Sequence, residues 1–348
     1  MNPQFQKILA ASPEDRRDLF LETANRLPST LQNVEKDFWV CWVLDLLFNG
    51  AEAGEPRLLF KGGTSLSKAY GLISRFSEDI DITVFRGDIG QPASIEELEG
   101  LTSNNQLKRR LEAIKGASRE HIQGPLKDRL NRQILAQFAQ AGINVQAAPV
   151  VVDPDDDQSL LVRYPPVSGA DPYVKSEVKI EAGARSALDP HQPTLLRPYI
   201  AEGLPDDLTV GGILTIDAQR TFWDKVLILH GLRAWYEKHQ ALRHDGNRES
   251  RHYYDIFRLM RSGVGQRAAK DKALALDCVR HAKMFFNRPD LDLAHAKPGS
   301  FAITPPVGME AMLRRDYQAM ARMIFGDIPD LADVLAEIAQ LERLINQP

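Results

Sequence analysis

A chain of 348 residues, 43% of them hydrophobic, is long enough for two or three domains or for one domain with a helical annex. Its formal net charge of −4 argues against a protein that coats nucleic acid non-specifically. Two cysteines without zinc-binding spacing, no secretory leader and no apolar stretch long enough to span a bilayer predict a cytoplasmic protein without a membrane partner.

The N-terminal quarter of the chain predicts helices followed by a strand–turn–helix–strand unit. Residues 1–50 are expected to be helical, because Pro13 and the two acidic residues after it suit a helix start and apolar residues follow at helical spacing. A short β-type run over 57–60 ends at a glycine pair. Residues 64–73 predict a helix capped by Thr64 or Ser65, and 79–85 alternate strictly, as a strand does.

The rest of the chain predicts a sheet followed by helices. Residues 95–140 form a basic helical insert, and strands dominate from about 144 to 184. Later helices are expected near 215–242, 251–262, 307–325 and 329–345. We therefore expect an α+β fold with a mixed sheet, divided into a core over 1–205, which includes the N-terminal helices and the insert, and a helical domain over 206–348.

Two carboxylates interrupt the apolar alternation of the strand at 79–85. Residues i and i+2 of a strand share a face, so Asp79 and Asp81 lie side by side while Ile80 and Ile82 face the core. Two like charges this close need a cation, and carboxylate oxygens suit Mg²⁺. An exposed strand edge is the alternative.

The glycine pair before these carboxylates favours a phosphate site. Glycine lets the backbone approach a phosphate closely, and the helix start behind it offers free N–H groups. Together with the carboxylates, this order predicts a site for an NTP and its metal. The candidate binding residues are Lys61, Gly62, Gly63, Thr64, Ser65, Arg75 and Ser77. For Arg75 and Ser77, which could contact phosphate or position Asp79, a plain turn is the alternative.

Six segments resemble, in order, the blocks of the AbiEii/AbiGii toxin family, which includes the MenT-type toxins and is similar to the DNA polymerase beta-like nucleotidyltransferases. They are FKGGTSLSKAY, RFSEDIDI, EAGARS, RPYIAE, FWDK and RHYYDIF, within residues 35–260. The resemblance implies a nucleotidyltransferase core and a third carboxylate on a later strand. We assign it to Glu181, although a surface ladder with Glu177 and Lys179 explains the same pattern.

Two helical residues gain a candidate role from this resemblance. Lys225 borders an apolar helix face, where it could cover the core or reach the triphosphate. Asp255 follows Arg251 by four residues, which also suits a helical ion pair. The family's lysine and aspartate blocks favour an active-site role for both. Basic clusters are candidates for an RNA-facing surface or are solvated helix faces, at Lys108, Arg109, Arg110, Lys115, Arg119, Arg258, Arg261, Arg267, Lys270 and Lys272.

We interpret the sequence as that of an enzyme that transfers a nucleotide from an NTP to an acceptor hydroxyl, with Mg²⁺ on Asp79 and Asp81. The resemblance implies a tRNA 3′ end as acceptor, growth arrest as effect and a cognate antitoxin as partner, in a toxin–antitoxin or abortive-infection system. The alternatives are an AMP- or UMP-transferring protein modifier, a phosphotransferase, and a nucleotide-binding module without turnover.

Overall fold

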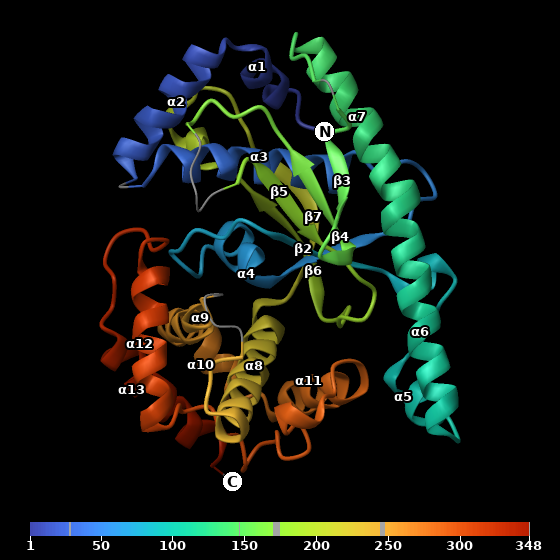
Figure 1. The fold of residues 1–348 in the computed structure, drawn as a ribbon, viewed down its shortest axis with the longest axis vertical. Coiled ribbons are helices and arrows are strands. Elements are labelled where there is room, and N and C mark those ends of the chain that lie inside the picture. Colours follow the sequence, from blue (N-terminus) through green and yellow to red (C-terminus); the bar gives the residue numbers. More distant parts are fainter. Residues whose placement is uncertain (28, 146, 170–174, 244–247, 348) are drawn as a thin grey trace. The chain divides into compact units, whose positions relative to one another are not determined.

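The computed structural model describes residues 1–27, 29–145, 147–169, 175–243 and 248–347. The chain forms two compact units (Figure 1). The first contains residues 1–69, 76–94 and 101–216, and the second contains 70–75, 95–100 and 217–348. Two short segments from the N-terminal half of the chain therefore belong to the second unit.

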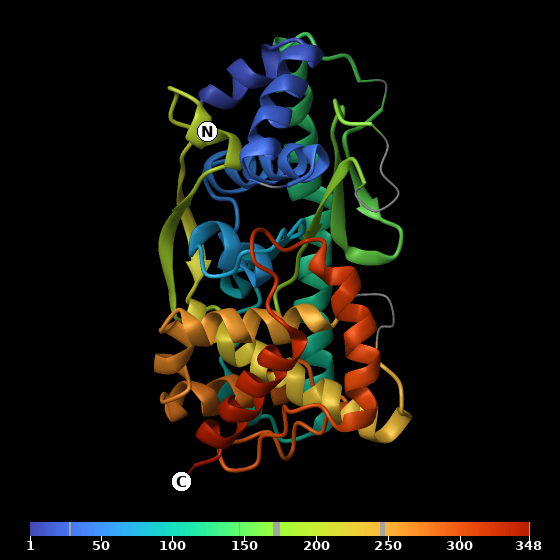
Figure 2. The same cartoon turned by 90° about the vertical axis from the view of Figure 1, so that its left-hand side faces the viewer.

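In the described part of the chain, the first unit holds a mixed sheet of seven strands, in the order β3-β4-β5-β2-β1-β7-β6. Pairs β2–β5 and β1–β7 are parallel, and the other neighbours are antiparallel. Figure 2 shows the two ends of this order, β3 with β4 and β6 with β7, on opposite sides of the unit. The strands are β1 (Leu58–Lys61), β2 (Ile80–Val84), β3 (Val150–Asp153), β4 (Asp156–Arg163), β5 (Glu177–Glu181), β6 (His191–Leu196) and β7 (Val210–Ile216).

Helix α3 (Leu31–Asn49) is the core element beside this sheet. It begins at Thr30, whose side chain accepts a hydrogen bond from the Asn33 N–H, and it packs against β5 and β7. Almost every side chain on it is buried, as its apolar sequence predicts. Trp39 stacks on Tyr164 with ring centroids 4.9 Å apart, which joins the helix to the chain that follows β4.

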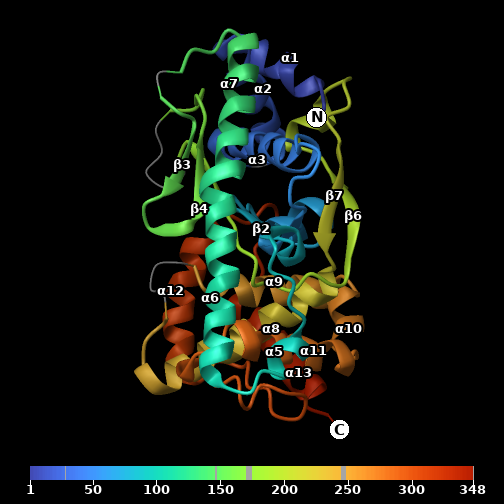
Figure 3. The same cartoon turned by 90° about the vertical axis from the view of Figure 1, so that its right-hand side faces the viewer.

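Further helices complete the first unit. Figure 3 shows α6, η3 and α7 as one nearly continuous helical column, and its two helices pack against β4 and β3. The elements are α1 (Gln4–Ala10), α2 (Pro13–Arg26), α4 (Gly62–Thr64), the π-helical turn η1 (Ser65–Ala69), the 3₁₀ turn η2 (Arg86–Ile89), α6 (Asn104–His121), the π-helical turn η3 (Ile122–Leu126), α7 (Lys127–Gln140) and the 3₁₀ turn η4 (Tyr199–Gly203).

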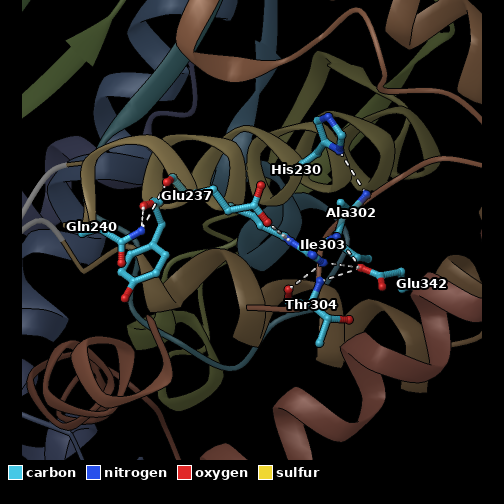
Figure 4. A network of polar contacts seen from close by, with 9 residues as sticks. His230, Glu237, Gln240, Ala302, Ile303, Thr304 and Glu342 are labelled. Carbon is cyan, nitrogen blue, oxygen red and sulfur yellow. Dashed lines mark hydrogen bonds and ion pairs between the residues drawn. The ribbon is translucent and has the colours of Figure 1, made fainter. Parts of the chain in front are cut away.

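The second unit is helical where it is described. Helix α8 packs against α9, α10 and α11, and α9 packs against α12 and α13. An extended segment is fixed between these helices: Glu342 accepts the N–H groups of Ile303 and Thr304, and His230 Nδ1 accepts the N–H of Ala302 (Figure 4). The elements are α5 (Ile95–Glu99), α8 (Ala218–His239), α9 (Ser250–Arg261), α10 (Val264–Ala268), α11 (Lys272–Phe285), η5 (Pro289–Leu291), α12 (Val307–Ala321) and α13 (Leu331–Ile345).

The expected α+β fold with a mixed sheet is confirmed, but the expectation for the helix after the glycine pair is wrong, and some elements were not predicted. The helix after the glycine pair begins at Gly62 rather than at a Thr64 or Ser65 cap, and helical structure ends at Ala69. Strands β6 and β7 were not predicted, because Pro193 and the glycine pair 211–212 are untypical of strands. Proline is tolerated in β6 because it is an edge strand. Helix α11 was not predicted as a separate element.

Within the described residues, the structure contains no helix that is both long and apolar enough to cross a membrane. Both cysteines, Cys41 and Cys278, are free and buried.

Candidate nucleotide and metal site

Three adjacent strands place a lysine and two carboxylates in one row. Lys61 at the end of β1 is the register partner of Asp81 in β2, and Asp81 is the register partner of Glu181 in β5. Directly paired residues point to the same face of a sheet. The side chains of Asp81 and Glu181 keep 24% and 46% of their surface exposed, so both can meet a ligand from solvent. The structure thus brings Glu181 beside Asp81.

Each of these carboxylates has a lysine near it. Lys61 Nζ lies 3.4 Å from Asp81 Oδ1. Lys179 Nζ lies 3.5 Å from Glu181 Oε1 and 3.0 Å from Asp153 Oδ2. Burial raises the pKa of Glu181 and the charge of Asp81 raises it further, while the two lysines lower it. Burial is therefore the main reason that the pKa of Glu181 is raised, and Asp81 adds to it.

Asp79 stands directly before β2 and interacts with the charges of Asp81 and Glu181. Its pKa is raised to about 7, first by burial and then by the charges of Glu78, Glu181 and Asp81, while Lys36 acts in the opposite direction. A bound cation would favour the ionised form of this carboxyl. Asp79, Asp81 and Glu181 are thus electrostatically coupled.

Gly62 lies directly against the side chain of Asp81. Its φ is 79°, a left-handed conformation that other residues rarely adopt. A β-carbon at this position would stand 1.9 Å from Asp81 Oδ2. Glycine is therefore required here for two reasons: the backbone conformation and the lack of space for a side chain. The backbone of the turn directly contacts the carboxylate.

The predicted hydroxyl ligands hold the turn together. Thr64 is fully buried, and its hydroxyl donates to the carbonyl oxygen of Asp79 and lies 2.8 Å from the Ser77 hydroxyl. Ser65 is also fully buried, and its hydroxyl donates to the Gly62 carbonyl at 2.9 Å. In this structure the Thr64 hydroxyl fixes the glycine turn to Asp79, directly before β2, and the Ser65 hydroxyl closes the turn on itself.

Arg75, Lys225 and Asp255 meet in the second unit. Arg75 Nε and Nη2 donate to the two Asp255 oxygens at 2.7 Å each, and Lys225 Nζ lies 2.7 Å from Asp255 Oδ2. Burial opposes ionisation of Asp255, but the two cations hold its pKa below the ordinary value. Asp255 and Arg75 are 180 residues apart, so no local pattern predicts their pairing.

Several basic residues of the candidate RNA surface have partners within their own unit. Arg119 pairs with Asp157 at 3.2 Å, and Arg258 donates to the Ser74 hydroxyl at 3.0 Å. The acidic run over 153–157 forms the turn between β3 and β4, where Asp153 is buried and paired with Lys179.

Among the residues that the structure describes, no three or more His, Cys, Asp or Glu side chains come together in a group that could by itself hold a metal ion. Mg²⁺ seldom has a cage made only of protein ligands. It commonly binds one or two carboxylates and completes its shell with water and substrate phosphates. One or two of the carboxylates Asp79, Asp81 and Glu181 would supply the hard oxygen donors that such binding uses.

The model of a protein family described as "Nucleotidyl transferase AbiEii toxin, Type IV TA system" matches residues 45–340. No curated protein matches the chain. Among solved structures, the chain is similar to MenT4, a nucleotidyltransferase toxin from Mycobacterium tuberculosis H37Rv, with 17% sequence identity and a TM-score of 0.40 over 94% of this chain and 97% of that one. The family match includes the glycine turn, the carboxylates of β2 and β5, and the Lys225–Asp255 pair.

Proposed function

This chain belongs to the AbiEii nucleotidyltransferase toxin family, and we propose that it transfers a nucleoside monophosphate from an NTP to the 3′ end of a tRNA. The chain is a toxin-type nucleotidyltransferase by that membership. Three further points are proposals: that the acceptor is a tRNA, that the protein acts in the cytoplasm and arrests growth, and that a cognate antitoxin restrains it. The observation that best supports a transfer reaction is the row in which Asp81 and Glu181 stand beside the turn at Gly62.

Asp79 and Asp81, with Glu181 beside them, would hold Mg²⁺. Oxygen donors suit this hard ion. Burial, and then neighbouring carboxylates, raise the pKa of Asp79 and Glu181, and a bound cation would favour the ionised form of both. When bound, the metal supplies positive charge that neutralises the triphosphate.

The residues of the first unit suit the other requirements of the reaction. Backbone N–H groups at Gly62 and Gly63, with the Lys61 ammonium, would hold the phosphates. The acceptor oxygen forms a bond to the α-phosphorus as the bond to the bridging oxygen breaks, and pyrophosphate leaves. Glu181, half-buried and with a raised pKa, would accept the hydroxyl proton.

The acceptor is tested by incubating the protein with each of four α-labelled NTPs and Mg²⁺ in the presence of a tRNA pool, a cell-protein pool or both. We expect label only in RNA, and removal by a 3′ exonuclease would place it at the 3′ end. Label in protein would instead indicate an AMP- or UMP-transferring modifier. Label that stays in NDP, with transfer of label in a parallel reaction that contains γ-labelled NTPs, would indicate phosphotransfer. Binding of NTP without formation of any product would contradict the assignment of an enzymatic activity.

Expression in growing cells tests the effect of the reaction. We expect arrest that depends on Asp81 and that a co-expressed antitoxin relieves. Continued growth at a level of protein that modifies tRNA in the same cells would contradict the proposed toxic role.

A further inference from the structure

Three consecutive charged residues in the first half of α3 are buried in the core of the first unit. Glu35, Lys36 and Asp37 are only 1%, 4% and 3% exposed. Buried charges are costly unless they are paired. Each of these has a distant partner, and the three partners lie in three different segments, around Val167, at Glu78 and at Lys68.

Asp37 is the centre of the most enclosed of these contacts. Its Oδ1 lies 2.7 Å from Lys68 Nζ, and its Oδ2 accepts the Tyr199 N–H at 2.7 Å. The Lys68 ammonium also lies 3.7 Å from the centre of the Tyr199 ring. Lys68 and Asp37 side chains are 5% and 3% exposed, so this ammonium does not reach a ligand in solvent.

Lys68 belongs to the turn that follows the glycine pair. It lies in η1, a π-helical turn directly continuous with α4. Such turns are rare and occur frequently at functional sites. Thr64 ties the start of this turn to the Asp79 carbonyl, and Lys68 ties its end to Asp37 of α3 and Tyr199 of η4. The turn is thus fixed at both ends.

We propose that Asp37, Lys68 and Tyr199 form a positioning cluster that holds the turn after Gly62 in the shape that binds the nucleotide phosphates. The inference rests on the proposed function, because it assigns the turn to a phosphate ligand. All three are positioning residues, since none touches the substrate.

A buried ion pair that only supports the fold can usually be replaced by well-packed apolar residues without loss of stability, whereas removal of one partner leaves a buried charge and destabilises the fold. Joint replacement of Asp37 and Lys68 therefore separates the two roles. The double variant should still fold, but the turn should lose its contact with Asp37 of α3 and Tyr199 of η4.

The test compares the full-length parent with Asp37→Leu/Lys68→Met by thermal unfolding, by the Kd of a non-hydrolysable NTP analogue with Mg²⁺, and by steady-state transfer. We expect a cooperatively folded protein whose Tm falls only modestly, because the Tyr199 N–H loses its acceptor. The KM should rise in parallel with Kd, and kcat/KM should be lower by on the order of a hundredfold. The exposed pair Glu52–Arg132, replaced as Glu52→Leu/Arg132→Met, is the control that should change neither affinity nor rate.

Tyr199→Leu, which keeps the ion pair and removes the ring, tests the cluster if the double variant does not fold. We expect weakened nucleotide affinity for Tyr199→Leu and parental affinity for Tyr199→Phe, which keeps the ring over Lys68. Parental Kd in both the double variant and Tyr199→Leu would overturn the inference. A parent that binds no NTP would contradict the proposed function instead, so the two failures are distinguishable.

Discussion

Gly62 and Asp81 are packed so closely that a β-carbon on Gly62 would stand 1.9 Å from Asp81 Oδ2. No side chain separates the backbone of the turn from the carboxylate of β2. A phosphate held by this turn and a cation held by Asp81 would therefore be direct neighbours, which is the arrangement that a metal-dependent nucleotide transfer needs.

Gly62→Ala should abolish transfer. The added methyl group clashes with Asp81 and displaces its carboxylate, and the φ of 79° adds backbone strain of about 1–2 kcal/mol. Gly54→Ala is a matched control, because Gly54 has a φ of 86° but open space around its β-carbon position. Gly54→Ala should lose similar stability and keep its activity. Equal activity of the two variants would show that the close approach at Gly62 is irrelevant to transfer.

Asp79→Asn should lower the transfer rate by roughly a hundredfold or more, because it removes a charged oxygen from the site of developing charge. It also removes one of several crowded negative charges, so the Tm should hold or rise. Asp128→Asn, on the exposed surface of α7, is the control for loss of a carboxylate charge. A less stable Asp79→Asn protein with full activity would argue for a purely structural role.

Lys225→Met should leave a folded protein. The likeness of residues 222–225 to the family's lysine block predicts that it loses transfer and toxicity, although the ammonium is buried against Asp255. Methionine keeps the apolar stem, and Arg75 still occupies both Asp255 oxygens, so the free energy of unfolding should fall by only about 1–3 kcal/mol. Lys238→Met, in the exposed last turn of the same helix, should be neutral. Growth arrest and Tm measured for both decide the matter: a stable, fully toxic Lys225→Met protein would place this lysine in packing alone.

Asp255→Asn should destabilise the second unit by about 3–5 kcal/mol at neutral pH, because it leaves two buried cations without a full counter-charge. The folded-state pKa of Asp255 is lowered from 3.8, so its contribution to stability is present above that pH and is lost as the pH falls further. The difference from the parent in urea unfolding should therefore narrow below about pH 4. Asp290→Asn, in an exposed pair with Lys238, should show little difference at any pH.

The sequence predicted those parts of the fold that depend on local pattern. Alternation around Ile80 and Ile82 marked β2, and apolar residues at helical spacing marked the helices within residues 1–50. Strands β6 and β7 were not predicted, because their proline and glycines are tolerated only in an edge strand and its neighbour. Which strands lie at the edge is set by pairing and not by composition.

The candidate site shows the same limit. Alternation along each strand indicates which residues share a face with Asp81 and which share a face with Glu181. The parallel pairing of β2 with β5, which places these two side chains next to each other, joins residues 100 positions apart. The partners of Asp255 and the burial of the charged run at 35–37 likewise depend on tertiary contacts. Local sequence therefore identifies the reactive groups, and long-range packing decides which of them meet.

Transfer of label from an α-labelled NTP to RNA, measured for the parent, Asp81→Asn and Glu181→Gln at saturating Mg²⁺, tests the role of the carboxylate pair directly. Both variants keep the shape of the side chain and remove its charge. We expect folded proteins with the parental Tm or higher and transfer reduced by at least about a hundredfold in each. Parental transfer by either variant would contradict the assignment of that residue to the reaction, and parental transfer by both would place the chemistry elsewhere in the chain.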